Sequence, residues 1–181
     1  MSTIEIIAAS AMEKVLTEYP GARRALFRKY HIGGCSSCGF QMDETLGEVC
    51  ERNNNLNVPE VLAEIQESHE ADQKILVKPK ILKAELEETP ELKLLDVRSQ
   101  EEFEAARIKG ATRMTRDLMQ EIMGRWDPEV AFVIIDHQGQ QGLDAAAYFL
   151  GHGLKNVRCL QGGIDAWSLE VDDSVARYEF S

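Results

Sequence analysis

The chain has 181 residues, of which 44% are hydrophobic, and a formal net charge of -11 at pH 7. A chain of that length can fold into one domain of ordinary size and one smaller domain. Its hydrophobic content excludes a chain that is disordered throughout. The acidic charge lies in both halves of the chain and repels phosphate groups, so nucleic acid and anionic membrane surfaces are not expected as partners.

Residues 1–68 are predicted to form a small all-α domain of about four short helices. Ser10 and Glu13 have the spacing of a capping box that opens the first helix. Asp43 is expected to cap the third helix, and Asn57 the fourth. A unit of this size buries little apolar surface, so its core is expected to be marginal.

The polar stretch ESHEADQK has no hydrophobic period and is interpreted as the end of the first domain and a linker, placed at residues 69–75. From residue 76 to residue 181 strand patterns alternate with helix patterns. Strands are predicted at 92–97, 132–135 and 156–160, and helices at 101–106, 116–123 and 142–150. This alternation predicts an α/β domain, with a parallel sheet covered by helices on both faces.

Three segments of the second domain resemble a single-domain rhodanese: LLDVRSQEEFEAARIKGA, the strand, loop and helix of 132–150, and NVRCLQGGIDAW. In that family the loop before the alanine-rich helix runs Cys-x-x-Gly-x-Arg-Ser. The cysteine carries sulfur as a persulfide, and backbone N–H groups of the loop hold the anion. The resemblance also implies that Asp96 and Arg98 are scaffold residues. The loop residues of this chain are Asp136, His137, Gln138, Gly139, Gln140, Gln141 and Gly142.

The resemblance therefore places Asp136 where the family has its cysteine and Gln141 where it has its arginine. A carboxylate cannot carry a sulfane sulfur, and its charge repels thiosulfate. We expect the domain to be catalytically inactive. Our hypothesis is that Asp136 is the loop's own anion, stays ionised and accepts hydrogen bonds from the loop amides. Cys159, in the strand that follows, is expected to pack in the core.

The first domain contains a second informative segment, HIGGCSSCGF, with glycines around Cys35 and Cys38. Two residues between cysteines let both sulfurs reach one metal ion or each other. Cys50 lies about one helix further on, although it shares an apolar stripe, and His31 is a weaker candidate for a fourth ligand. YPGARRALFRKYHIGGCSSCG followed by ETLGEVCERNN resembles the small helical domain at the start of iron-sulfur cluster repair proteins, and the resemblance covers about residues 10–66.

Three interpretations of these cysteines stay open. They form a redox or sulfur-carrying dithiol, they bind a metal, or they are structural. In the second interpretation the bound group is a zinc ion or an iron-sulfur cluster. A cluster shared by the two chains of a homodimer would have four thiolate ligands.

We interpret the chain as a non-sulfurtransferase accessory protein that handles thiols, sulfur or iron-sulfur clusters, with an inactive rhodanese-like domain that binds a protein partner of unknown identity. One alternative is a sulfurtransferase whose persulfide carrier is a first-domain cysteine. Another is a regulatory or scaffold module with structural cysteines. The sequence carries no signal-peptide pattern and no membrane-spanning stretch, so a cytoplasmic location is expected.

Overall fold

The computed structural model describes residues 5–33 and 39–178. The chain divides into two compact units, residues 1–74 and 75–181. Cys35 and Cys38 lie outside the described residues. Each unit buries its own apolar side chains.

The first unit is helical, as predicted. Its described helices are α1 (Met12–Glu18), α2 (Ala22–Tyr30), α3 (Leu46–Arg52) and α4 (Val58–Ile75). A single antiparallel bridge joins Ala11, before α1, to Thr45, before α3. The core is filled by apolar side chains of all the described helices, with Met12, Leu26 and Leu46 fully buried.

Residues 69–75, predicted to be a linker, are helical and form the last turns of α4. The linker prediction is wrong because the polar residues of α4 include buried acidic side chains that pair with basic residues of α2. Asp72 pairs with Arg24, and Glu64, only 8% exposed, accepts hydrogen bonds from Arg28 (3.0 Å) and Lys29 (2.8 Å). Neither α4, the longest described helix, nor any other in the described part of the chain could cross a membrane.

Two of the three predicted helix caps are wrong. The Oγ atom of Ser10 accepts a hydrogen bond from the backbone N–H of Ile7 (3.0 Å) instead of capping α1, whose N-cap is Ala11. Thr45, not Asp43, caps α3 through a capping box with Glu48. The cap predicted at residue 57 is confirmed, because Asn57 Oδ1 accepts from the N–H of residue 60 at 3.3 Å.

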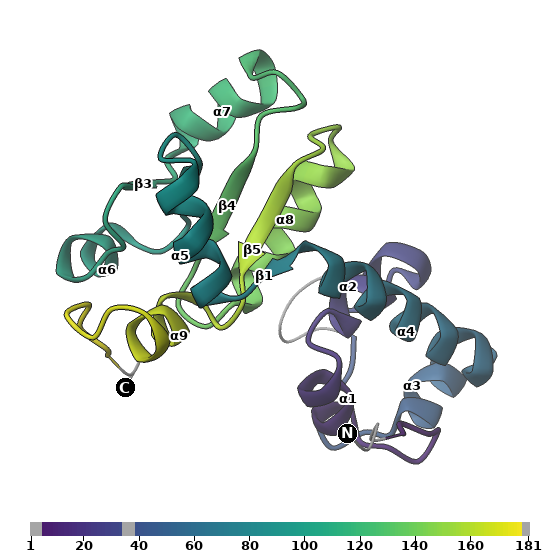
Figure 1. Cartoon of the computed structure of the whole chain (residues 1–181). Coiled ribbons are helices and arrows are strands. Elements are labelled where there is room, and N and C mark those ends of the chain that lie inside the picture. The colour runs from purple at the N-terminus through teal and green to yellow at the C-terminus, as the bar shows by residue number, and fades with distance from the viewer. Residues whose placement is uncertain (1–4, 34–38, 179–181) are drawn as a thin grey trace. The chain divides into compact units, whose positions relative to one another are not determined.

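The second unit is an α/β domain with a parallel sheet, as predicted, and in the described residues its strand order is β1-β5-β4-β2-β3 (Figure 1). Its elements are β1 (Leu76–Val77), α5 (Pro79–Glu88), β2 (Lys93–Asp96), α6 (Gln100–Ala105), β3 (Ala111–Arg113), α7 (Arg116–Arg125), β4 (Phe132–Ile135), α8 (Gln140–Gly151), β5 (Val157–Leu160) and α9 (Gly163–Glu170). The sequence had predicted β2, α6, α7, β4, α8 and β5, with boundaries displaced by a few residues.

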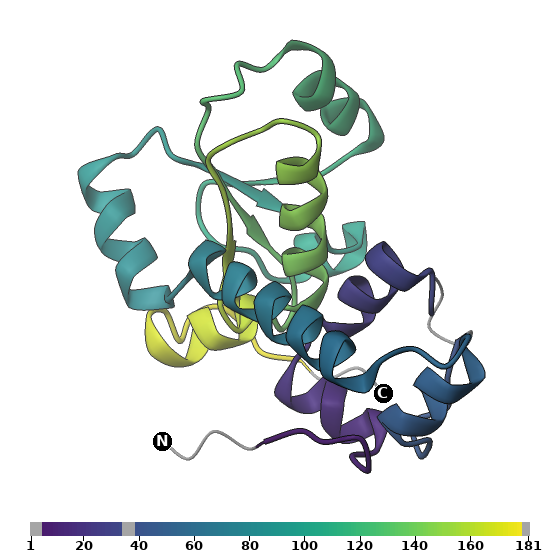
Figure 2. The same cartoon turned by 90° about the vertical axis from the view of Figure 1, so that its right-hand side faces the viewer.

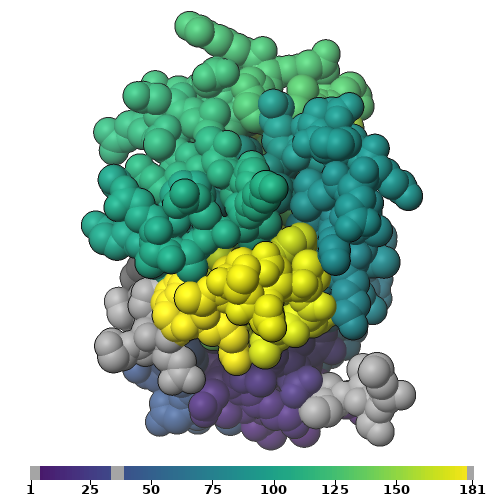
Figure 3. All heavy atoms as spheres, turned by 60° about the vertical axis from the view of Figure 1, so that its left-hand side comes forward, coloured from purple at the N-terminus to yellow at the C-terminus, as the bar shows by residue number. Residues whose placement is uncertain are grey.

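Each face of the sheet has its own apolar core. On β4, Val133 and Ile135 face α5 and α9, whereas Phe132 and Ile134 face α7 and α8. Figure 2 shows α8, in light green, lying across the strands, and Figure 3 shows α9, in yellow, beside α5 and the α6 region. Because all the strands are parallel, their carboxyl ends share one edge, and the turn from β4 into α8 lies at that edge.

Candidate functional site

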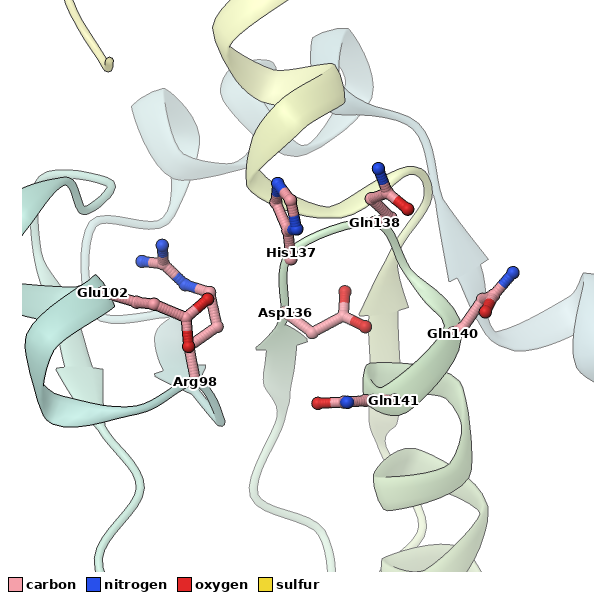
Figure 4. Close-up of a pocket in the computed structure, with 7 residues that line it drawn as sticks. All are labelled: Arg98, Glu102, Asp136, His137, Gln138, Gln140 and Gln141. Atoms are coloured by element: carbon pink, nitrogen blue, oxygen red, sulfur yellow. The ribbon is translucent and has the colours of Figure 1, made fainter. Parts of the chain in front are cut away.

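The candidate site is the loop between β4 and α8. Asp136 follows the last residue of β4 and is only 2% exposed. Its Oδ1 accepts a hydrogen bond from the backbone N–H of Gly139 (2.5 Å), and its Oδ2 accepts one from the N–H of Gly142 (2.9 Å). In Figure 4 the carboxylate is turned toward the loop and the start of α8. The hydrogen bonds expected for Asp136 as the loop's own anion are therefore present.

Burial and hydrogen bonding act in opposite directions on this carboxyl group. Burial raises the pKa of Asp136, and the backbone N–H groups of Gly142, Gly139 and Gln141 lower it. The net result is a pKa above the usual value for aspartate, so the amides offset only part of the cost of burying the charge.

The backbone around Asp136 is packed so closely that two glycines have no room for a side chain. A Cβ atom on Gly142 would lie 2.8 Å from Cys159 Sγ and 3.3 Å from the Asp136 carboxyl carbon. A Cβ atom on Gly163 would lie 2.5 Å from the carbonyl oxygen of His137. Cys159 is fully buried beneath α8, as its predicted role in the core requires.

The start of α9 fixes the same loop from the other side. The backbone N–H of Ile164 donates to the carbonyl oxygen of Asp136 (2.8 Å), and the N–H of Asp165 donates to that of His137 (3.1 Å). The loop is therefore held by β4, α8 and α9 together, which fixes the path of its backbone.

A pocket of about 410 Å³ opens in front of this loop (Figure 4). Arg98 is the only cation of the described residues that line it, and each nitrogen of its guanidinium donates a hydrogen bond within the protein. It forms a bidentate pair with Asp96, with Nη2 to Oδ2 at 2.6 Å. It also donates to the carbonyl oxygen of Ala106 (2.6 Å) and to the hydroxyl of Tyr178 (2.8 Å). The pocket residues are Arg98, Glu102, Asp136, His137, Gln138, Gln140 and Gln141.

Sequence reasoning missed two residues of this site, Glu102 and Tyr178. The Tyr178 hydroxyl donates to Glu102 Oε1 (2.7 Å), and its ring stacks on His137 with centroids 4.5 Å apart. Burial and the bond to Glu102 raise the pKa of Tyr178 to about 12, despite the opposing effect of Arg98. Burial raises the pKa of Glu102, but the bonds from Tyr178 and Ser99 outweigh it and leave that pKa below its usual value.

Comparison with known proteins identifies the second unit. The family model described as a rhodanese-like domain matches residues 78–170. The chain belongs to the rhodanese-like domain family. The matching segment includes β4, the Asp136 loop and α8, so the candidate site lies within the rhodanese-like domain.

Curated relatives match the same domain. A protein named thiosulfate sulfurtransferase GlpE from Pseudomonas entomophila is 27% identical over 74 residues, which are 41% of this chain and 68% of that protein. The GlpE of Pseudomonas savastanoi is 24% identical over 84 residues, which are 46% of this chain and 79% of the relative.

Solved structures were also found. A rhodanese-like domain protein from Staphylococcus aureus has a TM-score of 0.47 and 20% identity, over 57% of this chain and 98% of that one. The human single-domain sulfurtransferase TSTD1 has a TM-score of 0.45 and 22% identity, over 53% and 96%.

Of the candidate residues of the first unit, the structure describes Cys50 and His31. Cys50 is 1% exposed in the helical core, and burial raises the pKa of its thiol, which disfavours the thiolate that a metal ligand must be. His31 is the C-cap of α2, with a left-handed φ of 58°, and its ring packs on Phe27. Across residues 5–33 and 39–178, no group of three or more His, Cys, Asp or Glu residues could hold a metal ion.

The glycines that flank Cys35 and Cys38 lie close together. Gly33 and Gly39 both have positive φ, at 76° and 99°, and a Cβ atom on Gly39 would lie 2.4 Å from the Gly33 nitrogen. Side chains are therefore excluded at this approach of the backbone.

We predict that Asp136→Ala lowers the free energy of unfolding at neutral pH by about 1–3 kcal/mol, because two buried N–H groups lose their acceptor. The loss should grow as the pH falls. Since the pKa of Asp136 is raised in the folded state, the folded parent binds a proton more tightly than the unfolded one and gains stability as the pH falls through that pKa. Urea unfolding between pH 7 and pH 4 measures both effects.

Asp165→Ala is the matched control for this experiment. The hydrogen bond from Arg177 lowers the pKa of Asp165, so its contribution to stability should shrink as the pH falls. An Asp136→Ala variant that is more stable than the parent would contradict the role of Asp136 as the anchor of the loop.

Proposed function

We propose that the chain is an accessory protein without sulfurtransferase activity, in which a cysteine-bearing helical domain is joined to a rhodanese-like domain that binds a protein partner. The observation that carries the proposal is the occupation of the loop amides by the Asp136 carboxylate. A thiosulfate sulfurtransferase needs a thiolate to receive the sulfur and free donors to hold the anion.

The electrostatics of the pocket support the same proposal. The sulfurtransferase GlpE relatives are named for a reaction on the dianion thiosulfate. In this chain two carboxylates, those of Asp136 and Glu102, line the pocket, and the guanidinium of Arg98 is already paired with Asp96. Thiosulfate would enter a pocket without an available cation, and repulsion between like charges disfavours its binding.

The first domain supplies the chemistry in this proposal. Cys35 and Cys38 handle thiols, sulfur or an iron-sulfur cluster, and the second domain brings them to the partner. Cys50 does not fit as a further ligand, because it is buried in the core and its thiol pKa is raised. A visible spectrum and metal analysis of anaerobically purified protein would distinguish a cluster, a zinc ion and a metal-free dithiol.

A thiosulfate:cyanide assay on the full chain tests the proposal. We expect no thiocyanate above the rate of the Asp136→Ala variant. Turnover that disappears in Cys35→Ala or Cys38→Ala would instead establish a sulfurtransferase with its persulfide carrier in the first domain. Turnover by the double variant, in which Cys35 and Cys38 are both replaced by alanine, would show that the rhodanese-like domain itself is active, and would refute the proposal.

A further inference from the structure

We propose that the pocket in front of the Asp136 loop binds an organic cation, an ammonium or a guanidinium group, in place of the anion. The inference rests on the proposed function, and it specifies what the rhodanese-like domain recognises. The inference depends on two observations. Several donors of the pocket are already bonded within the protein, and several acceptors are still available to a ligand.

The backbone donors of Gly139 and Gly142 and the guanidinium of Arg98 are used within the protein. The N–H groups of Gly139 and Gly142 donate to Asp136. The side chain of Arg98 is 1% exposed, and its guanidinium donates to Asp96, Ala106 and Tyr178. An anionic ligand held by these donors would have to displace a buried hydrogen bond, and the displaced group would lose its partner.

The groups that favour a cation are still in place. Glu102 is half-buried in the wall of the pocket, and its lowered pKa keeps it ionised at neutral pH. Each of its carboxylate oxygens accepts one hydrogen bond, from Tyr178 or from Ser99, and a carboxylate oxygen can accept a second. Behind it, the charge of Arg98 is balanced by Asp96, so the carboxylates set the sign of the local potential.

Three glutamines complete the opening. Gln138, Gln140 and Gln141 are exposed, and their side chains form no hydrogen bond to any other residue that the structure describes. Figure 4 shows Gln138 and Gln140 pointing away from Asp136. Each side-chain amide has an oxygen that can accept from an ammonium or guanidinium group and an NH2 group that can donate to an anion, so the preference for a cation comes from the carboxylates.

The aromatic rings near Glu102 are already paired within the protein. The rings of His137 and Tyr178 stack on each other, with 7° between their planes, and the Arg98 guanidinium lies over the Tyr178 ring, 5.9 Å from its centroid. The cation is therefore expected to bind through the carboxylate, with which a planar guanidinium forms parallel hydrogen bonds that an anion cannot form. The chemistry fits an arginine or lysine side chain of a protein partner, and it also fits a free small amine.

The test is a titration of the full chain followed by amide NMR at constant ionic strength. The probes are propylguanidinium, a peptide with one internal arginine, and thiosulfate. We expect saturable shifts of the amides of residues 138–142 with both cations and none with thiosulfate. If the peptide binds more tightly than propylguanidinium, the ligand is a side chain of a protein partner. If the two bind equally, the ligand is a free small cation.

Two variants with the same change of net charge separate a specific site from the acidic background of the chain. Glu102→Gln should weaken binding of propylguanidinium about fivefold, the effect of losing one partly screened ion pair. The capping box with Ser99 tolerates glutamine at this position, so the fold should be kept. Glu101→Gln, one residue away on the exposed side of α6, should leave the affinity unchanged.

A third variant is designed to reverse the charge of the ligand that the pocket favours. Gln141→Arg should abolish binding of propylguanidinium and introduce weak binding of thiosulfate. The inference is overturned if the loop amides show no saturable shift with either cation, or if Glu101→Gln and Glu102→Gln have equal effects. Thiocyanate production by the parent would refute the proposed function, whereas a failed titration without turnover would refute only the cation site.

Discussion

Replacing Asp136 with cysteine and Gln141 with arginine should turn the chain into a thiosulfate sulfurtransferase, with a rate at least about 100-fold above the parent. The backbone for the reaction is already present. A thiolate at position 136 would meet the same N–H groups of Gly139 and Gly142 that now bind the carboxylate. It would take the outer sulfur of thiosulfate with release of sulfite, and cyanide would then remove that sulfur as thiocyanate.

Steady-state thiocyanate production by the double variant is the measurement, with each single variant as a control. Asp136→Cys alone lacks the added cation and should be slower, and Gln141→Arg alone should be inactive because it has no nucleophile. An inactive double variant with a native fold would show that features beyond these two positions suppress sulfur transfer, and our account of the loop would then be incomplete.

The expected gain depends on keeping glycine at position 142, where the rhodanese pattern has serine. A Cβ atom there would lie 2.8 Å from Cys159 Sγ, so a third change, Gly142→Ser, should reduce rather than increase the activity. The clash is with a short buried side chain that has little room to move. Adding Cys159→Ala should restore what the serine removes, because it deletes the sulfur that the new side chain would meet.

The sequence is a good guide where one segment determines its own structure. The apolar run of β4, the glycine-bearing loop and the alanine-rich α8 follow one another directly, and the structure has them within two residues of the prediction. By contrast, β1 and β3 are two and three residues long, too short for a period of two to stand out. Both are strands only because the parallel sheet supplies their partners.

The parts that sequence reasoning missed depend on contacts between distant residues. Tyr178 reaches Glu102 across 76 positions of sequence, and nothing near either residue marks it as part of a pocket. The same limit applies to the end of α4, where Asp72 is buried against Arg24, 48 positions away. A polar stretch such as the end of α4 is interpreted as a linker when the basic residue that pairs with its buried carboxylate is not known.

The buried pair of Asp96 and Arg98 gives the second prediction. Asp96→Asn should lower the free energy of unfolding of the rhodanese-like domain by about 3–5 kcal/mol, because the guanidinium stays buried after its counter-charge is gone. The cost is large because Asp96 is fully buried and Arg98 is 4% exposed, so water cannot replace the lost carboxylate. The chain has two tryptophans, Trp126 and Trp167, and both are in this domain, so their fluorescence in urea follows its unfolding.

The control for this prediction is an ion pair of the same domain that faces water. Glu85 holds Arg158 in a bidentate pair, with side chains 34% and 31% exposed. Because solvent screens that pair, Glu85→Gln should cost about 1 kcal/mol at most. If Asp96→Asn costs no more than Glu85→Gln, Arg98 must find another partner in the variant, and the wall of the pocket is then less rigid than these hydrogen bonds indicate. If the costs differ as expected, the buried pair of Asp96 and Arg98 is a fixed part of the wall of the pocket.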